Sequence, residues 1–179
     1  VHTQGLEERK EGQPVVVFEN GHGVPLDNWE KVWSGVAESA PFIAYDRAGI
    51  GKSDSTTELP TIQHVSDRLV TLLEPLEVEP PYLLVGHSLG GLYVRRFPIY
   101  YPDLLAGLVI IDPADFTETQ SNQRIYYEGL ELSDAQVDSL IQSFVDRRNA
   151  RHKTAAGPVS REGLYLEDIR AREFAEIMA

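Results

Sequence analysis

Short apolar runs alternate along the chain with longer stretches in which apolar residues recur every three or four positions. Each run is rich in β-branched and aliphatic residues and ends in a turn-forming segment, which is the pattern of a buried strand. The runs cover residues 14–19, 42–45, 82–85 and 107–111. We therefore predict four strands at these positions.

The stretches between the runs have helical spacing and cover residues 28–39, 61–76 and 89–101. In the second stretch the apolar residues share one helix face. Strands that are apolar throughout and alternate with helices form a parallel sheet covered by helices on both faces. The sequence therefore predicts an α/β fold with a mostly parallel sheet, in which ligands bind beyond the carboxyl ends of the strands.

The pattern changes after Pro113, where no further strand-like run occurs and charged residues become more frequent. The sequence Ser133-Asp134-Ala135-Gln136 has the form of a capping box that opens a helix. A second helix is predicted over about 163–178. We expect a partial α/β core over residues 1–113 and a helical cap, or lid, over residues 114–179.

Composition narrows the range of partners. The 179 residues include 16 basic and 28 acidic ones, a formal net charge of −12, which repels phosphate backbones. We expect no nucleic-acid partner. The chain has no cysteine, and no H-E-x-x-H spacing occurs, so we expect no metal. No apolar run is long enough to span a bilayer. The compartment stays open, with the cytoplasm as the default.

The chemistry is concentrated at Ser88, in the sequence Gly86-His87-Ser88-Leu89-Gly90. This G-x-S-x-G pentapeptide follows a predicted strand and precedes a predicted helix, which is the context that a nucleophile elbow requires. A serine hydroxyl needs a neighbouring histidine to take its proton, and a carboxylate to orient that histidine. Ser88 is therefore the predicted nucleophile; the alternative is a helix N-cap serine between glycines.

A serine nucleophile also needs two backbone donors for the negative oxygen of its intermediate. The N–H of Leu89 is one, because it lies at a helix N-terminus, where the dipole favours negative charge. The other is expected in the loop after the first apolar strand, residues 20–23. The N–H of His22 is our first choice and that of Gly23 the second.

Four motifs in order resemble the α/β-hydrolase superfamily, and the resemblance extends over nearly the whole chain. The first is Glu19-Asn20-Gly21-His22-Gly23 with Trp29 downstream, which is similar to the oxyanion loop and places His22 at the donor. The others are the turn at 45–53, the elbow at 84–91 and the strand at 107–113. The resemblance implies a cofactor-free, esterase- or lipase-like hydrolase with a helical cap after Pro113.

The triad of that family follows the order serine, acid, histidine, and here the histidine is missing. Only His152 follows Ser88, within a basic run of the expected cap. Asp112 is a candidate for the acid, because some relatives place it after this strand; a structural role at the strand end is the alternative. We interpret the chain as a fragment that starts within the second family strand and lacks the catalytic histidine.

Other polar residues have simpler interpretations. Asp46, Arg47 and Ser53 are expected to hold their own turn together through local hydrogen bonds. His64 lies on a predicted helix and is expected to be solvated. His87 adjoins the nucleophile and is expected to line the pocket without acting as a base.

Three hypotheses for function remain. The first is hydrolysis of a small ester, lactone or amide through an acyl-serine. Serine at position 88 argues against the dehalogenase and epoxide-hydrolase branches, which use a carboxylate nucleophile, whereas peroxide-using relatives stay open. The second is a non-catalytic binding module on the same fold. The third is a partner chain that completes the sheet through homo-oligomerisation or strand exchange, because an unfinished sheet exposes an edge prone to pairing.

Overall fold

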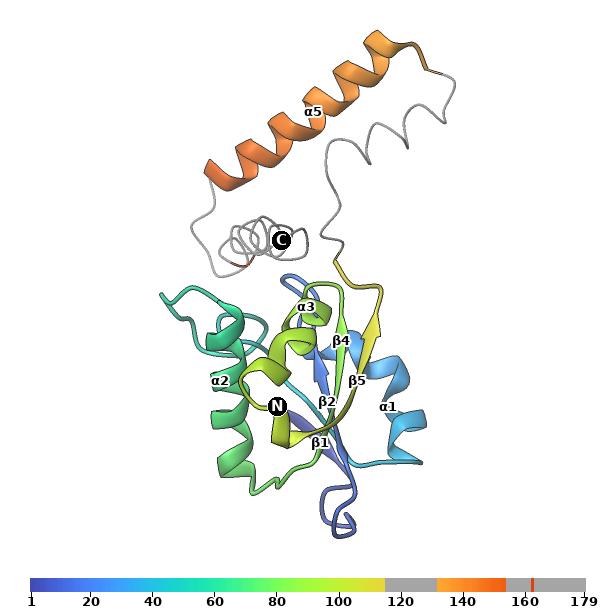
Figure 1. Ribbon diagram of the computed structural model, residues 1–179, viewed down its shortest axis with the longest axis vertical. Helices are drawn as coiled ribbons and strands as arrows, with labels where there is room; N and C mark the ends of the chain where they lie inside the picture. Colours follow the sequence, from blue (N-terminus) through green and yellow to red (C-terminus); the bar gives the residue numbers. More distant parts are fainter. Residues whose placement is uncertain (115–131, 154–161, 163–179) are drawn as a thin grey trace. The chain divides into compact units, whose positions relative to one another are not determined.

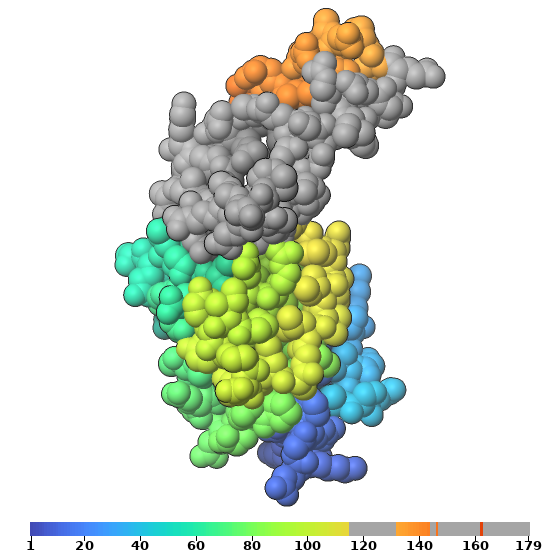
Figure 2. Space-filling model, viewed as in Figure 1, coloured from blue at the N-terminus to red at the C-terminus, as the bar shows by residue number. Residues whose placement is uncertain are grey.

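The computed structural model describes residues 1–114, 132–153 and 162, and it divides the chain into two compact units. The first unit is Val1–Ala114 and the second is Asp115–Ala179. The first unit holds a sheet with helices around it, and the second holds the long helix α5 (Asp134–Lys153) (Figure 1). Figure 2 shows the same chain in space-filling form, coloured along the sequence.

The sheet has five strands in the order β1-β3-β2-β4-β5. Strands β2, β3, β4 and β5 run parallel, and β1 pairs antiparallel with β3. The predicted mostly parallel sheet is therefore confirmed. Four strands lie where the apolar runs predicted them, and β1 lies around Val1-His2-Thr3, where the family resemblance placed a strand. Their bounds are β1 (His2–Gln4), β2 (Val15–Glu19), β3 (Phe42–Ala44), β4 (Tyr82–His87) and β5 (Leu105–Ile111).

Helices cover both faces of this sheet because successive side chains of the buried strands point to opposite sides. Val15 and Val17 of β2 pack in a core with residues of α2 (Ile62–Leu73) and α3 (Leu89–Arg96). Val16 and Phe18 pack on the other face, where α1 (Glu30–Ala37) contributes. By the same alternation, Glu19 follows Val15 and Val17 onto the face of α2 and α3.

Two predicted helices end earlier than the apolar spacing suggested, in each case near a proline. Helix α3 stops at Arg96 and continues as a 3₁₀ turn, Phe97–Ile99, which contains Pro98. Helix α2 stops at Leu73 before a similar turn, Glu74–Leu76. Proline has no N–H to donate and clashes with the preceding turn of an α-helix, so it ends the regular hydrogen bonding.

Strand β5 forms one edge of the described sheet, with β4 as its hydrogen-bonded neighbour. Its last three residues are apolar and half-exposed: Val109 is 41% exposed, Ile110 39% and Ile111 41%. An apolar edge strand offers unpaired backbone groups and apolar side chains to another strand.

The second unit begins its helix as the sequence predicted. The backbone N–H of Ser133 donates to the side-chain oxygen of Gln136 at 2.9 Å, which is the reciprocal bond of a capping box. The helix predicted over 163–178 lies outside the described residues. Among the helices that are described, none combines the length and apolarity that a membrane span needs.

Candidate active site

Ser88 occupies the turn between β4 and α3 in a backbone conformation that non-glycine residues rarely adopt. Its φ is 52° and its ψ is −118°. The turn is fixed at both of its peptide groups: the N–H of Ser88 donates to the carbonyl of Ile111 at 3.1 Å, and its carbonyl accepts from Gly91 at 3.0 Å. This is the sharp strand-to-helix elbow that the sequence predicted, and it presents the serine beyond the carboxyl end of β4.

The two glycines of the pentapeptide allow this turn by leaving room for neighbouring backbone. A Cβ on Gly86 would lie 2.5 Å from the carbonyl oxygen of Gly90. A Cβ on Gly90 would lie 2.3 Å from the carbonyl oxygen of Glu19 and 2.6 Å from that of Asn20. Real Cβ atoms essentially never approach so closely, so glycine at 86 lets the end of β4 approach the first turn of α3, and glycine at 90 lets the end of β2 pack against that turn.

The predicted oxyanion loop, residues 20–23, lies beside the elbow. A Cβ on Gly21 would be 3.5 Å from the Cβ of Ser88 and 3.2 Å from Nδ1 of His87. Leu89 is fully buried at the first position of α3, whereas the side chain of His22 is exposed. The structure thus brings together Ser88, Leu89 and the loop that contains His22. Their roles as oxyanion donors stay predictions.

The acid and the base are not assembled around Ser88 in the described part of the chain. Asp112 is exposed directly after β5, with a φ of 40°. Among the described residues, no hydrogen bond joins a histidine to Ser88 or to Asp112. His152 lies in α5 of the second unit, and its side chain is outside the described set. The assignment of Asp112 as the acid stays a prediction.

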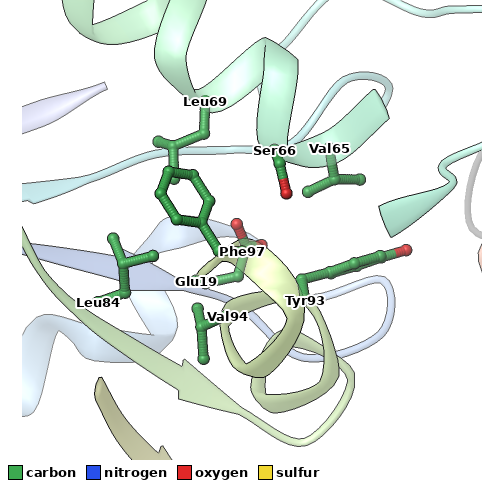
Figure 3. Close-up of a pocket in the computed structure, with 8 residues that line it drawn as sticks. All are labelled: Glu19, Val65, Ser66, Leu69, Leu84, Tyr93, Val94 and Phe97. Atoms are coloured by element: carbon green, nitrogen blue, oxygen red, sulfur yellow. The ribbon is translucent and has the colours of Figure 1, made fainter. Parts of the chain in front are cut away.

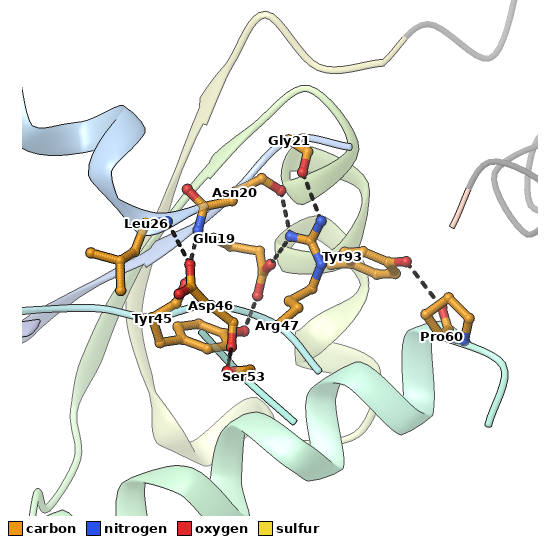
Figure 4. Close-up of polar contacts among 10 residues, drawn as sticks. All are labelled: Glu19, Asn20, Gly21, Leu26, Tyr45, Asp46, Arg47, Ser53, Pro60 and Tyr93. Atoms are coloured by element: carbon orange, nitrogen blue, oxygen red, sulfur yellow. Dashed lines mark hydrogen bonds and ion pairs between the residues drawn. The ribbon is translucent and has the colours of Figure 1, made fainter. Parts of the chain in front are cut away.

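A buried polar network that the sequence analysis missed lies under the oxyanion loop (Figure 4). Glu19 is 2% exposed and Arg47 5% exposed, and the Arg47 Nη1 and Glu19 Oε1 atoms are 2.5 Å apart. The hydroxyl of Tyr45 donates a short hydrogen bond to the other carboxylate oxygen of Glu19. Burial, followed by the negative charge of Glu19, raises the pKa of Tyr45 well above its usual value.

Arg47 reaches beyond its own turn, and the expectation of purely local bonds is wrong for this residue. Its Nη1 donates to the carbonyl of Asn20 at 2.6 Å and its Nη2 to the carbonyl of Gly21 at 2.7 Å. The guanidinium also lies 5.4 Å from the centre of the Tyr93 ring, over its face. The physical reason is the buried carboxylate of Glu19, which needs a buried cation as its partner.

Asp46 and Ser53 do hold the turn, as expected. The hydroxyl of Ser53 donates to the carbonyl of Asp46 at 2.7 Å, and the Asp46 carboxylate accepts from the N–H of Lys52 at 3.0 Å. The same carboxylate accepts from the N–H of Leu26 at 2.7 Å, which ties the turn to the segment after the oxyanion loop.

His64 lies on a helix as predicted but is only partly exposed and has a charged partner, whereas the expectation that His87 lines a substrate pocket stays a prediction. His64 lies on α2, 28% exposed, with its Nε2 3.0 Å from the carboxylate of Glu58. His87 is partly buried and meets the ring of Trp29 edge-on, with 6.2 Å between ring centres. Its Nδ1 has no hydrogen-bond partner among the described residues. Within the same residues, no group of three metal-ligating side chains gathers.

A small cavity of about 10 Å³ lies between α2, α3 and the sheet (Figure 3). The carboxylate-bearing side chain of Glu19 lines it together with Ser66 and apolar side chains such as Leu69. This volume holds about one water molecule. Ser88 does not line it, so it is a gap in the core under the network and not a substrate pocket.

The sharp elbow at Ser88, the glycine contacts around it and the sheet order indicate the α/β-hydrolase fold. A comparison with known protein families agrees. The model of the alpha/beta hydrolase fold family matches residues 14–151. The chain therefore belongs to the α/β-hydrolase family.

The names of individual relatives indicate a hydrolase but no particular substrate. The chain is 34% identical over 114 residues to the uncharacterized protein YqjL of Bacillus subtilis, covering 63% of this chain and 44% of the relative. It is 31% identical over 151 residues to the bifunctional esterase/perhydrolase DCH of Acinetobacter calcoaceticus, covering 81% and 52%. A thermophilic esterase from Thermogutta terrifontis superposes with a TM-score of 0.56 at 26% identity, covering 72% and 46%. The chain spans about half the length of the curated relatives it matches.

Proposed function

We propose that this chain carries the nucleophile of a serine hydrolase that cleaves a small ester, lactone or amide through an acyl-serine at Ser88. The observation that carries the proposal is the left-handed φ of 52° at a serine between strand and helix. Such a conformation costs about 1–3 kcal/mol and is retained where the geometry serves a function. A helix N-cap serine gains nothing from it.

The proposed chemistry has two steps. The hydroxyl oxygen of Ser88 attacks the substrate carbonyl carbon while a base takes its proton, and the leaving group departs with that proton. Water then attacks the acyl-serine, its proton passes to the base and on to Ser88, and the carboxylic acid leaves. In both steps the N–H groups of Leu89 and His22 bind the carbonyl oxygen as it becomes negative.

The scheme requires a histidine as the base, and none of the described side chains is assigned this role. Reaction of Ser88 with an ester or a fluorophosphonate therefore requires that such a base reaches it. Names of relatives support the reaction class: one is called an esterase and perhydrolase and another an esterase. The perhydrolase activity in the name of that relative makes peroxide an alternative to water as the nucleophile of the second step.

A non-catalytic binding module is the second candidate. It is favoured by the absence of a histidine bonded to Ser88 among the described residues. The close approach of Glu19 to Gly90 counts against it, because a binder needs neither the sharp elbow nor two converging backbone segments.

Intact-protein mass spectrometry after incubation with p-nitrophenyl acetate tests the proposal. We expect a mass increase of one acetyl group that is absent in Ser88→Ala. Arg68→Gln serves as the matched control, because it removes an exposed ion pair with Glu58 far from the elbow in sequence. Acetylation of Ser88→Ala to the same extent would contradict the proposal, since the ester would then react elsewhere.

A further inference from the structure

We propose that Arg47 is a positioning residue that sets the direction of the His22 N–H toward the reacting carbonyl oxygen. The inference rests on the proposed function, because it concerns the oxyanion-binding loop of that site. It goes further by assigning the loop's geometry to a side chain 26 positions away.

The peptide group between Gly21 and His22 joins a carbonyl that Arg47 binds to the N–H of His22. In a trans peptide the C=O of one residue and the N–H of the next point in opposite directions in one plane. The cis peptide bond of the first unit is Pro80-Pro81, so Gly21–His22 is trans. Nη2 of Arg47 donates to the Gly21 carbonyl at 2.7 Å. The His22 N–H is therefore fixed pointing away from the guanidinium.

The neighbouring peptide group is fixed by the same side chain. Nη1 of Arg47 donates to the Asn20 carbonyl at 2.6 Å, and both carbonyls turn toward the guanidinium in Figure 4. Two bonds from one rigid, planar group hold two successive peptide planes. Gly21, between them, is the residue with the greatest conformational freedom and the greatest need of such a restraint.

The guanidinium is itself held firmly. Glu19 binds it at 2.5 Å, the Tyr45 hydroxyl binds Glu19 from the other side, and the ring of Tyr93 packs against it. Arg47 is 5% exposed, so little water competes for these bonds. Tyr93 belongs to α3, the helix that starts at the elbow. Arg47 thereby couples the loop that contains His22 to the helix that starts at Leu89. It therefore also couples the two predicted oxyanion donors to each other.

A cationic donor on the Gly21 carbonyl also acts through the peptide bond. A charge-assisted hydrogen bond to C=O polarises the amide and strengthens the N–H on its far side as a donor. A lysine offers one compact charge and cannot hold Glu19 and two carbonyls in a single plane. Arg47→Lys should therefore keep the buried positive charge but no longer orient the two peptide groups.

The test compares Arg47→Lys with Tyr82→Phe, which removes a buried hydrogen bond of 2.7 Å to Val78 at the opposite end of β4. Circular dichroism and urea melts establish that each is folded. The rate of Ser88 labelling by a fluorophosphonate is then measured against probe concentration. For Arg47→Lys we expect the maximal rate to fall about tenfold to a hundredfold with half-saturation unchanged. Tyr82→Phe should label at the wild-type rate.

A spectroscopic measurement makes the inference independent of activity. In ¹⁵N,¹³C-labelled protein we expect Arg47→Lys to move the Gly21 carbonyl carbon upfield and to shift the His22 amide, while Tyr82→Phe moves neither. Should Arg47→Lys not fold, Glu19→Gln/Arg47→Met removes both buried charges and leaves no unpaired carboxylate. If neither variant folds, the test is made on the wild-type protein alone. The chemical shift of its Gly21 carbonyl carbon must then lie downfield of the value measured in the unfolded chain.

The outcomes separate the two proposals. Absence of labelling in folded wild-type protein overturns the proposed function, and the carbonyl and amide shifts still decide whether Arg47 orients the loop. Labelling of Arg47→Lys at the wild-type rate, or unchanged Gly21 and His22 signals, overturns the inference about Arg47.

Discussion

The backbone of Gly90 lies against the carbonyl oxygen of Glu19, and a Cβ added to Gly90 would stand 2.3 Å from that oxygen. The contact joins the first turn of α3 to the end of β2. Because both partners are backbone, neither can rotate away as a side chain would. The elbow and the oxyanion loop can thus lie this close together only because residue 90 has no Cβ.

Gly90→Ala should therefore separate the loop from the elbow. We expect a loss of about 1–3 kcal/mol in the free energy of unfolding, as for an overpacked core. Gly35→Ala in α1 is the matched control: its Cβ meets nothing within 4 Å, and alanine favours a helix over glycine by up to about 1 kcal/mol. Urea unfolding measures both variants. Equal stability of the two variants would contradict the contact.

The strained backbone of Ser88 leads to a second prediction, in which a substitution increases the free energy of unfolding. Its φ of 52° is accessible to glycine without penalty, so Ser88→Gly should raise the free energy of unfolding by about 1 kcal/mol. Ser88→Ala keeps a Cβ and should show no such gain. Thermal or urea unfolding of the pair isolates the backbone effect, because both variants lack the hydroxyl. An alanine variant as stable as the glycine variant would show that the elbow is unstrained.

The central sheet could be predicted from the sequence because buried parallel strands are apolar on both faces. The run Val15–Glu19 is buried at every position and was found as a strand. No apolar run marks strand β1, His2–Gln4, because its burial is low and its sequence is polar; only the family resemblance placed a strand around Val1-His2-Thr3. It owes its conformation to pairing with β3, a long-range contact that local pattern does not record.

The sharp strand-to-helix turn at Ser88 could be predicted as well, whereas the contacts of Arg47 could not. The G-x-S-x-G spacing is local, but the partners of Arg47 lie 26 to 28 positions away along the chain. A basic residue in a turn is most often exposed. One signal was present in Glu19: a carboxylate at the end of a fully apolar strand needs a buried cation, and Arg47 follows the neighbouring strand.

Tyr45 should make stability depend on alkaline pH. Burial and the charge of Glu19 raise its pKa in the folded state, while the unfolded value is about 10. Its contribution is therefore fully present below about pH 10 and is lost as pH rises above that value. We expect Tyr45→Phe to be less stable than wild type at neutral pH by about 1–3 kcal/mol, because Glu19 loses a buried donor.

The difference between wild type and Tyr45→Phe isolates this tyrosine from other groups that titrate. Urea unfolding at several pH values should show the difference shrinking above about pH 10. Tyr82→Phe provides a comparison, since burial also raises the pKa of Tyr82 but no carboxylate accepts its hydroxyl bond. A Tyr45→Phe difference that stays constant through about pH 11 would contradict the ionisation argument.

The exposed end of β5 predicts self-association of this chain. Val109 and Ile111 alternate with Ile110, so apolar groups are exposed on both sides of the edge strand. We expect sedimentation velocity to show species larger than the monomer that grow with concentration. Val109→Lys/Ile111→Lys should reduce them, as charged residues do on natural edge strands. A monodisperse monomer with a cooperative melt would count against strand exchange.

Labelling with a fluorophosphonate, read by intact mass and peptide mapping, tests the central claim most directly. Wild-type chain and Ser88→Ala are first shown to be folded and are then treated alike. The account predicts one added phosphonyl group, located on Ser88 in the elbow peptide and absent from Ser88→Ala. A folded wild-type chain that remains unlabelled at Ser88 would contradict the assignment of Ser88 as an activated nucleophile.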